Sequence, residues 1–286
     1  MDAVARPFRS VLYIPGSNAR ALDKARGLPA DAIIFDLEDA VAPEAKEAAR
    51  DQLAATLAEG GYGPRTRIAR VNGLTTPWGA ADIAAMRGAD AILLPKVNGV
   101  ADVAAAAALA PDTPLWAMIE TPLGVLNAAA IAAHPAMQGF VLGTNDLAKD
   151  IGCRTGGDRM ALMTSLQMAL LGARAAGIVS VDGVYNAFRD EDGLRAECEQ
   201  GRALGFDGKT LIHPAQLAVA NAVFAPDPAE LDLARRQIEA FEAAEAAGQG
   251  VAVLEGEIVE NLHVAVARAL IARAEVIARM EKDAKS

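Results

Sequence analysis

The sequence predicts an α/β protein built on a closed (β/α)8 barrel, and two regularities support this fold class. Short apolar runs recur between residues 10 and 212, and longer helical patterns lie between them. Runs this continuously apolar are typical of parallel strands that helices cover on both faces. Because eight of them occur within about 200 residues, a closed barrel is favoured over an open doubly wound sheet.

The eight expected strands are runs of β-branched or strongly apolar residues. In chain order they occupy residues 10–14, 32–37, 66–71, 91–96, 115–120, 139–144, 178–183 and 206–212. Helical patterns such as residues 43–59 and 158–177 connect them. Since the last of these runs ends shortly before residue 225, we expect the barrel domain to span residues 1–224.

A different pattern begins at residue 225. Residues 226–250 predict a helix that is entered through prolines and left through glycines. Residues 250–259 predict a short hairpin, and residues 261–282 predict a long final helix. We therefore expect residues 225–286 to form a C-terminal helical and hairpin extension that acts as a lid or an oligomer contact.

Composition and charge limit the classes of partner. The net charge of −10 argues against nucleic acid, because phosphate binding needs a basic face. No uninterrupted apolar run of about 18 residues occurs, so no membrane span is expected. The N-terminus lacks an apolar signal core, which favours a cytoplasmic location. Cys153 and Cys198 fit no CxxC pattern and are expected to be reduced thiols.

Polar side chains follow nearly every expected strand at its carboxyl end. In strand order they are Asp36, Glu38, Asp39, Arg70, Asn72, Lys96, Glu120, Asn145, Asp146, Asp182 and His213. The carboxyl ends of barrel strands meet at one rim, where barrel enzymes place their catalytic residues. A barrel without a site would not need this concentration of charge, so the rim is predicted to be an active site.

Several of these residues also fit a purely structural role. Acids after a strand are typical of helix caps and solvated loops, and Asp146 also fits a side-chain-capped turn. Asp182 precedes a glycine, as turn residues often do, and His213 is expected to pack in a loop. For Glu120, two interpretations stay open, a simple helix cap and a functional ligand.

Carboxylates outnumber cations at this rim, and a hard divalent cation is the simplest way to neutralise them. Oxygen ligands suit Mg²⁺, or alternatively Mn²⁺, and Mg²⁺ usually takes one or two carboxylates together with substrate and water. Glu120 and Asp146 follow adjacent strands and are the predicted metal ligands. A Schiff-base lysine at Lys96 or Lys209 remains an alternative. Zinc spacings, a GxSxG elbow, a P-loop and a GxGxxG turn are absent from the sequence.

Six segments, taken together, resemble one known family. They are RSVLYIPGSNARALDKA, ADAIIFDLEDAVAPEAKEAAR, RVNG, ILLPKV, WAMIET and GTNDLAKDIG. In this order they resemble the citrate lyase β-subunit-like family of the HpcH/HpaI aldolase superfamily, from residue 9 to about residue 224. That family includes malyl-CoA and citramalyl-CoA lyases. The block VDGVYNAFRDEDGLRAECEQGRALGFDGKTLIHPAQ resembles members that act on malyl-CoA, including malyl-CoA thioesterases.

The resemblance implies a role for several residues. Family members are Mg²⁺-dependent TIM barrels whose metal ligands match Glu120 and Asp146. The matching arginine, Arg70, would clamp the carboxylate of a small acid, and Glu38 and Asp39 match acids that lie beside the metal and its waters. The basic or rigid residues expected to meet the CoA moiety are Arg9, Pro15 and Lys24, with Lys46 and Arg50 as further candidates. A homo-oligomer, a trimer or hexamer, is also implied.

The tail departs from the family pattern. Family lyases carry a G-x-x-I-D segment whose aspartate reaches a neighbouring subunit's site, whereas this chain has GEIVENLH, with Glu260 at that position. One extra methylene displaces a base by about 1 Å, which can cost on the order of a hundredfold in rate. The departure favours hydrolysis of (3S)-malyl-CoA to malate and CoA.

Two other functions stay open. The first is carbon–carbon cleavage of malyl-, methylmalyl-, citramalyl- or citryl-thioesters to acetyl- or propionyl-CoA and a 2-oxo acid. The second is a citrate lyase β subunit that works on an acyl carrier protein within a complex. A silent metabolite-binding barrel is expected to lack one of Arg70, Glu120 and Asp146, and all three are present.

Overall fold

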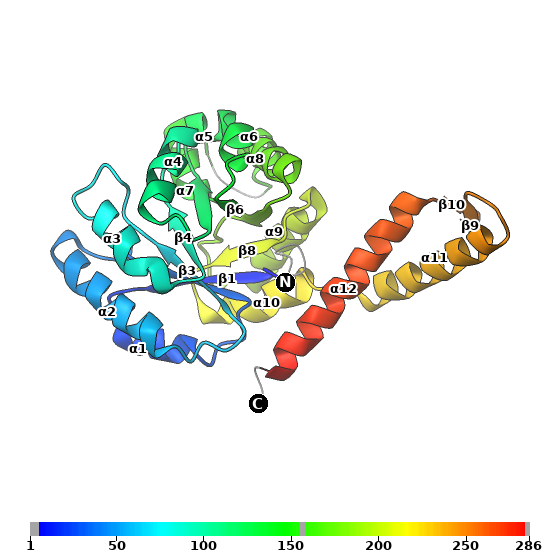
Figure 1. The fold of residues 1–286 in the computed structure, drawn as a ribbon, viewed down its shortest axis with the longest axis horizontal. Helices are drawn as coiled ribbons and strands as arrows, with labels where there is room; N and C mark the ends of the chain where they lie inside the picture. The colour runs from blue at the N-terminus through cyan, green and yellow to red at the C-terminus, as the bar shows by residue number, and fades with distance from the viewer. Residues whose placement is uncertain (1–5, 155–157, 284–286) are drawn as a thin grey trace. The chain divides into compact units, whose positions relative to one another are not determined.

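The computed structural model describes residues 6–154 and 158–283, and its centre is a closed barrel of eight parallel strands (Figure 1). The strands are β1 Ser10–Pro15, β2 Ala32–Asp36, β3 Thr66–Arg70, β4 Ala91–Leu94, β5 Leu115–Ile119, β6 Met137–Leu142, β7 Val179–Asp182 and β8 Gly208–Leu211. Each strand pairs with the next, and β8 pairs with β1. The predicted fold class is confirmed.

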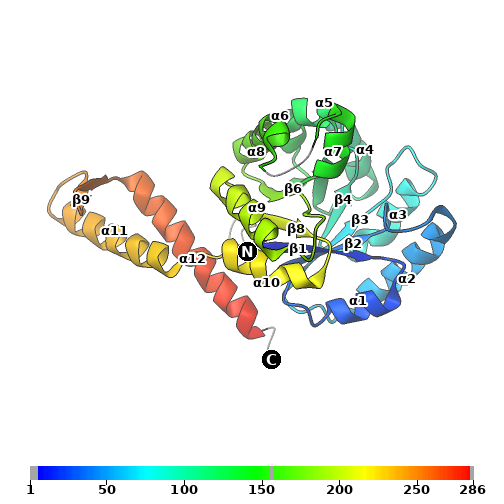
Figure 2. The same cartoon turned by 180° about the vertical axis from the view of Figure 1, so that it is seen from behind.

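Helices surround the strands on the outside of the barrel, as both views show (Figures 1 and 2). They are α1 Ala19–Ala25, α2 Lys46–Glu59, α3 Gly79–Ala85, α4 Val100–Leu109, α5 Pro122–Leu126, α6 Ala128–Ala132, α7 Thr144–Ile151, α8 Met163–Ala176, α9 Glu191–Leu204 and α10 Leu217–Val223. Within residues 6–154 and 158–283, no helix is long and apolar enough to cross a membrane.

Side chains alternate between the two faces of the barrel wall. On β2, Ile34 belongs to a compact cluster of strand residues that includes Trp116 and Val181 and fills the barrel interior. Its neighbours Ile33 and Phe35 belong instead to the large cluster formed with the helices. This two-sided burial explains why the strands are apolar without alternation, which is the pattern that predicted them.

The expected strand over residues 91–96 ends two residues early. β4 stops at Leu94 because Pro95 has no N–H group with which to continue the ladder. Lys96 follows with a positive φ of 51°, a backbone conformation that residues other than glycine rarely adopt. The strand end is therefore a sharp corner, and it places the backbone of Lys96 at the rim.

The chain divides into two compact units, the barrel over Phe8–Phe224 and a unit that contains the segment from Ala225 onward. The second unit contains helix α11 Pro228–Ala246, a hairpin of β9 Ala252–Leu254 and β10 Glu257–Val259, and helix α12 Asn261–Asp283. A small core of Ala244, Ala252, Val259 and Val264 holds these elements together. The predicted helix, hairpin and final helix are all present.

The barrel is tightly closed at the amino-terminal end of β8. A methyl group added to Gly208 would lie 1.7 Å from the carbonyl oxygen of Phe8, so the two backbones touch where only glycine fits. We expect Gly208→Ala to lower the free energy of unfolding by about 1–3 kcal/mol or more, because backbone cannot yield as a side chain can. Gly88→Ala is the matched control, since no atom lies within 4 Å of its added methyl group. Urea unfolding of both variants measures the difference; equal midpoints would contradict this close contact.

Candidate active site

A cavity of about 540 Å³ opens at the carboxyl ends of the strands, and we call it the rim pocket. Five of the predicted site residues line it, namely Pro15, Asp39, Arg70, Glu120 and Asp146. They come from the ends of β1 and β3, from the segments directly after β2 and β5, and, for Asp146, from the first turn of α7, which follows β6. The closed barrel therefore brings together residues that are up to 131 positions apart in the chain.

Arg70 is the centre of an ion-pair network beside this pocket. Its Nε and Nη2 donate to the two carboxylate oxygens of Asp36, at 2.7 and 2.5 Å. Its Nη1 lies 2.9 Å from Glu38 Oε2 and 3.3 Å from Asp39 Oδ2. The Tyr13 ring lies below the guanidinium, 5.0 Å from its carbon. One cation thus pairs with three neighbouring acids, and a net negative charge remains.

Burial and hydrogen bonding act in opposite directions on Arg70. Burial disfavours its charged form, but the bonds to Asp36 outweigh this and raise the pKa of Arg70. Its side chain is only 8% exposed, so loss of Asp36 would leave a buried charge without its main partner. Nε and Nη2 of the guanidinium both bond to Asp36. Nη1 is on the side that faces the more exposed Asp39.

Asp36 was predicted to lie at the rim but was given no role of its own, although it organises the whole turn. Besides binding Arg70, its carboxylate accepts the N–H groups of Glu38 at 2.8 Å and Ala40 at 3.1 Å. Lys46 closes the turn from below, because its Nζ donates to the carbonyls of Leu37 and Glu38. The pairing of Asp36 with Arg70 follows from the register of β2 and β3, in which the two residues are direct partners.

Glu120 is almost completely buried, with 1% of its surface exposed. Its Oε1 accepts the backbone N–H of Lys96 at 2.7 Å. On the other side, a methyl group added to Gly143 would lie 2.6 Å from Oε2, so glycine is required for the carboxylate to fit. Burial, together with the negative charges of Glu38 and Asp146, raises the pKa of Glu120 to about 7.

This excess of negative charge matches the donor set of a hard divalent cation. Glu120 and Asp146 supply two carboxylates at one pocket, which is the protein contribution that Mg²⁺ commonly receives. No group of three or more His, Cys, Asp or Glu side chains suited to a metal exists within residues 6–154 and 158–283. The residues present therefore fit a cation that keeps open positions for water and substrate rather than a closed structural metal site.

Arg9 does not lie at the rim, and its expected contact with CoA stays a prediction without support from its position. It precedes β1, so it sits at the amino-terminal end of the barrel, the end opposite to the rim. There it is 4% exposed, and its guanidinium donates to both oxygens of Asp31 at 2.9 Å. The strand of six residues separates it from the rim by roughly 20 Å.

Lys46 and Arg50 make contacts within the protein, and their expected contact with CoA also stays a prediction. Lys46 is 6% exposed and holds the turn after β2, while Arg50 reaches the buried carboxylate of Asp82 at 3.5 Å. Lys24 is exposed on α1 and does not line the rim pocket. Of the residues expected to meet CoA, Pro15 alone lines that pocket.

Glu260 lies in the C-terminal extension, directly before α12. Its side chain is exposed, and its backbone N–H donates to Nδ1 of His263 at 3.0 Å. A role for Glu260 in catalysis stays a prediction.

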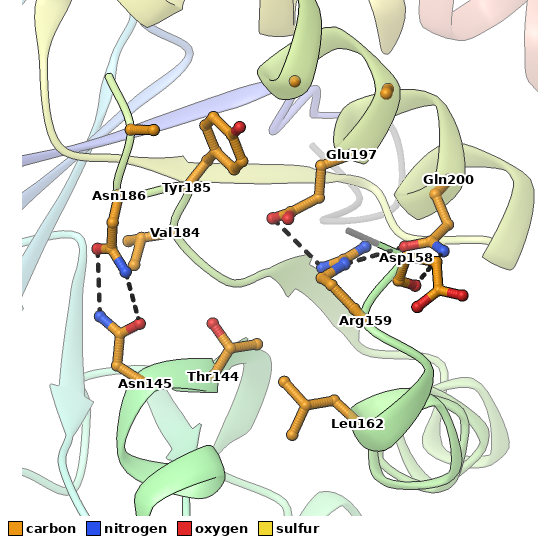
Figure 3. A pocket seen from close by; sticks show the side chains of 13 residues that line it. Thr144, Asn145, Asp158, Arg159, Leu162, Val184, Tyr185, Asn186, Glu197 and Gln200 are labelled. Carbon is orange, nitrogen blue, oxygen red and sulfur yellow. Dashed lines mark hydrogen bonds and ion pairs between the residues drawn. The ribbon is translucent and has the colours of Figure 1, made fainter. Parts of the chain in front are cut away.

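A second cavity, of about 630 Å³, adjoins the rim pocket (Figure 3). The two cavities share Thr144, Asn145 and Val184. Asn145 and Asn186 exchange two hydrogen bonds through their amide groups, at 2.8 and 3.3 Å, and this pair links the loop after β7 to the start of α7. Sequence patterns gave no signal for this pair, because it depends on how two loops meet.

Beside the second cavity lies a buried network of two cations and two acids. Lys209 is fully buried and donates to Asp182 at 3.0 Å and to Glu197 at 2.6 Å. Arg159 donates to both oxygens of Asp182. Although burial favours the neutral form, these two cations hold the pKa of Asp182 below its usual value. Lys209 is engaged by these two acids and does not line the rim pocket, so the geometry lends no support to the Schiff-base alternative there.

His213 packs in a loop, as expected. Its Nδ1 accepts the N–H of Ala215 at 3.1 Å, and its ring stacks on Phe188 with centroids 4.6 Å apart. The imidazole is therefore used for capping and packing.

With this geometry in view, comparison with known proteins identifies the family. A model of the HpcH/HpaI aldolase/citrate lyase family matches residues 9–214. The chain belongs to this family. A (3S)-malyl-CoA thioesterase of Cereibacter sphaeroides (strain KD131) is 66% identical over 276 residues, which cover 96% of this chain and 97% of that protein. The citrate lyase subunit beta of Escherichia coli (strain K12) is 36% identical, covering 95% of this chain and 94% of that one.

Solved structures of family proteins share the fold of this HpcH/HpaI chain. CitE from Mycobacterium tuberculosis, in complex with magnesium, acetoacetate and coenzyme A, aligns with a TM-score of 0.78 at 29% identity. The alignment covers 95% of this chain and 99% of CitE. RipC from Yersinia pestis aligns with a TM-score of 0.67 at 30% identity, covering 78% of this chain and 97% of RipC.

The raised pKa of Glu120 makes the stability of the metal-free protein depend on pH. Unfolding lowers that pKa from about 7 to about 4.5, so the folded state holds the proton more tightly and loses stability as pH rises through 7. Glu120→Gln mimics the protonated form. In EDTA at about pH 8 it should be more stable than the parent, by up to about 3 kcal/mol, and the gain should shrink towards about pH 5.5. Urea unfolding at both pH values measures this.

Glu44→Gln serves as the control, because Glu44 is exposed and the same substitution there should leave the free energy of unfolding unchanged at both pH values. A Glu120→Gln variant that is less stable than the parent at both pH values would contradict the electrostatic account.

Proposed function

We propose that this chain is a Mg²⁺-dependent enzyme that hydrolyses (3S)-malyl-CoA to malate and CoA. One observation carries the proposal: the chain is 66% identical, over 96% of its length, to a protein named as that thioesterase. The rim pocket supports it, because Arg70, Glu120 and Asp146 line one cavity as a small dicarboxylic acid would need.

Glu120 and Asp146 are the proposed ligands of Mg²⁺, with Mn²⁺ as an alternative ion. When bound, the ion would act as a Lewis acid and template for the oxygens of the acyl group. Two features of the chain keep Glu120 ready for this role, namely the N–H group of Lys96 and the space left by Gly143. CitE, which shares the fold, was crystallised with magnesium and coenzyme A.

Arg70 is proposed to bind the carboxylate of the malyl group through Nη1. Its Nε and Nη2 are held by Asp36, whereas Nη1 lies 2.9 Å from Glu38 Oε2 and 3.3 Å from Asp39 Oδ2, the longer of the two contacts. The side chain of Asp39 is 61% exposed, so a substrate carboxylate can take its place at little cost in desolvation. Asp36 then fixes the orientation of the guanidinium throughout.

The hydrolytic step needs a base for water. Water attacks the thioester carbonyl, its proton passes to Asp39 or Glu38, the carbon–sulfur bond breaks, and the CoA thiolate takes up a proton. Glu38 lies between two cations, Arg70 and Lys96. Asp39 is the more exposed of the two acids and makes the longer ion pair with Arg70, so it is the stronger candidate for the base.

A lyase is the second candidate, and the similarity to citrate lyase subunit beta favours it. In that reaction a base removes the hydroxyl proton, the carbon–carbon bond breaks, and acetyl-CoA leaves as its enolate and is then protonated. Glu260 is the proposed base for this activity. A citrate lyase β subunit acting on a carrier protein is a further alternative.

The C-terminal extension, residues 225–286, is proposed to act as a lid or as a contact within a homo-oligomer, a trimer or hexamer. Its exposed apolar side chains include Val253, Ile258, Leu262 and Val266. Exposed apolar side chains concentrated on one small unit are typical of an interaction surface. Lys24 and Pro15 remain proposed contacts of the CoA moiety.

A product assay separates these functions. We expect purified protein with Mg²⁺ and (3S)-malyl-CoA to release malate and free CoA. Glyoxylate and acetyl-CoA would instead establish the lyase, and a complete lack of turnover of free CoA thioesters would favour the carrier-dependent subunit.

The metal ligands have a direct test. Asp146→Ala should lower Mg²⁺-dependent turnover by at least about a hundredfold, because the ion contributes several kcal/mol to the reaction. Asp150→Ala is the matched control, since it removes an exposed acid from the same helix, α7. Steady-state rates at increasing Mg²⁺ measure both. The ligand assignment is wrong if Asp146→Ala keeps the parent's rate and metal dependence.

A further inference from the structure

Lys96 contacts two acids of the rim, Glu120 and Glu38, and it does so through two different groups. Its backbone N–H donates to Glu120 Oε1 at 2.7 Å. Its Nζ donates to Glu38 Oε1 at 2.9 Å. The side chain is 53% exposed, whereas that of Glu38 is 12% exposed. One residue at the end of β4 thus links the buried carboxylate of β5 with the acidic turn after β2.

The backbone of Lys96 adopts a conformation that its side chain disfavours. Its φ is 51°, and positive values are found at two other non-glycine residues within residues 6–154 and 158–283. Such a conformation persists where the surrounding structure fixes it, and it recurs at functional sites. At Lys96 it coincides with the hydrogen bond from the backbone N–H to Glu120 Oε1.

Hydrogen bonds made by Asn98 hold the backbone of Lys96 in this conformation. Asn98 Nδ2 donates to the carbonyl of Lys96 at 3.1 Å, and Asn98 Oδ1 accepts the hydroxyl of Thr121 at 2.6 Å. The carbonyl of Asn98 accepts Nδ2 of Asn127 at 2.7 Å. The loop after β4 is therefore bound to the loop after β5, which begins with Glu120.

We propose that Lys96 is a positioning residue, whose left-handed backbone sets the Glu120 carboxylate for a divalent cation while its ammonium holds Glu38. This inference rests on the proposed Mg²⁺ site at Glu120 and Asp146. The two contributions have opposite effects on cation affinity. The N–H group favours binding because it fixes a ligand, and the ammonium opposes binding because it is a positive charge near that ligand.

Two substitutions separate the contributions. Lys96→Gly keeps the N–H group, adopts a positive φ without strain, and removes the ammonium. Lys96→Val removes the ammonium as well, but its β-branched side chain disfavours a positive φ and turns the N–H group away from Glu120. Lys96→Arg keeps the charge and the backbone and should behave as the parent.

Isothermal titration of the EDTA-treated full-length protein with MgCl2 measures the affinities, and thermal unfolding confirms that each variant is folded. We expect Lys96→Gly to bind Mg²⁺ several-fold more tightly than the parent, and Lys96→Val to bind it at least about tenfold more weakly than Lys96→Gly. Lys96→Ala, with an intermediate cost at positive φ, should fall between them and replaces Lys96→Val if that variant does not fold.

Equal affinities for the glycine and valine (or alanine) variants would overturn the proposal, as would a glycine variant weaker than the parent. A purely structural role would lower thermal stability in parallel with affinity and would not make the glycine variant tighter. The parent and Glu120→Ala are measured alongside. The proposed metal site fails, together with the role of Lys96, if the parent does not bind Mg²⁺ or if Glu120→Ala binds it as well as the parent does. If the parent binds Mg²⁺ and Glu120→Ala binds it more weakly, but the Lys96 variants do not differ, only the role of Lys96 fails.

Discussion

The ion pair between Arg70 and Asp36 is the interaction on which the rest of the rim depends. Strand register makes the two residues direct partners at the ends of β2 and β3, where both are almost fully buried. Neither charge is tolerable there without the other, since breaking a buried pair costs about 3–5 kcal/mol. Asp36 also accepts two N–H groups of the following turn, so charge balance and turn geometry form one unit.

This unit divides the charges of the rim into two parts. The acids after β2 are balanced within the protein, because Glu38 lies between Arg70 and Lys96. Glu120 and Asp146 are not balanced in this way, and their mutual repulsion contributes to the raised pKa of Glu120. An added cation therefore gains most at Glu120 and Asp146, whereas at Glu38 it would have to compete with two cations already present. Under the proposed function, the ion would therefore bind at one side of the acidic rim.

Sequence rules located Arg70, Glu120 and Asp146 because the strands of a barrel all deliver their carboxyl ends to one rim. The same rule, applied to Arg9, would have placed it at the opposite end, since it precedes its strand. Family resemblance alone had suggested a role there. Asp36 was placed at the rim, but its pairing with Arg70 was missed, because that pairing depends on the register of β2 and β3, which no local pattern reports. Lys96 was weighed only by its side chain, whereas its backbone makes the contact with Glu120.

The choice between hydrolysis and carbon–carbon cleavage follows from where a base can lie. Cleavage needs a base that meets a substrate hydroxyl in a site from which water is excluded. Glu38 is enclosed, and burial raises its pKa although its two ion pairs favour the charged form. Both of its carboxylate oxygens are engaged, however, Oε1 with Lys96 and Oε2 with Arg70, so neither is free to meet a substrate hydroxyl. Asp39 has a single long pair with Arg70 and is 61% exposed, so it meets water readily. The acids of the turn after β2 thus suit hydrolysis. Under the proposed function, carbon–carbon cleavage would require a base from outside this turn, and Glu260 would have to be that base.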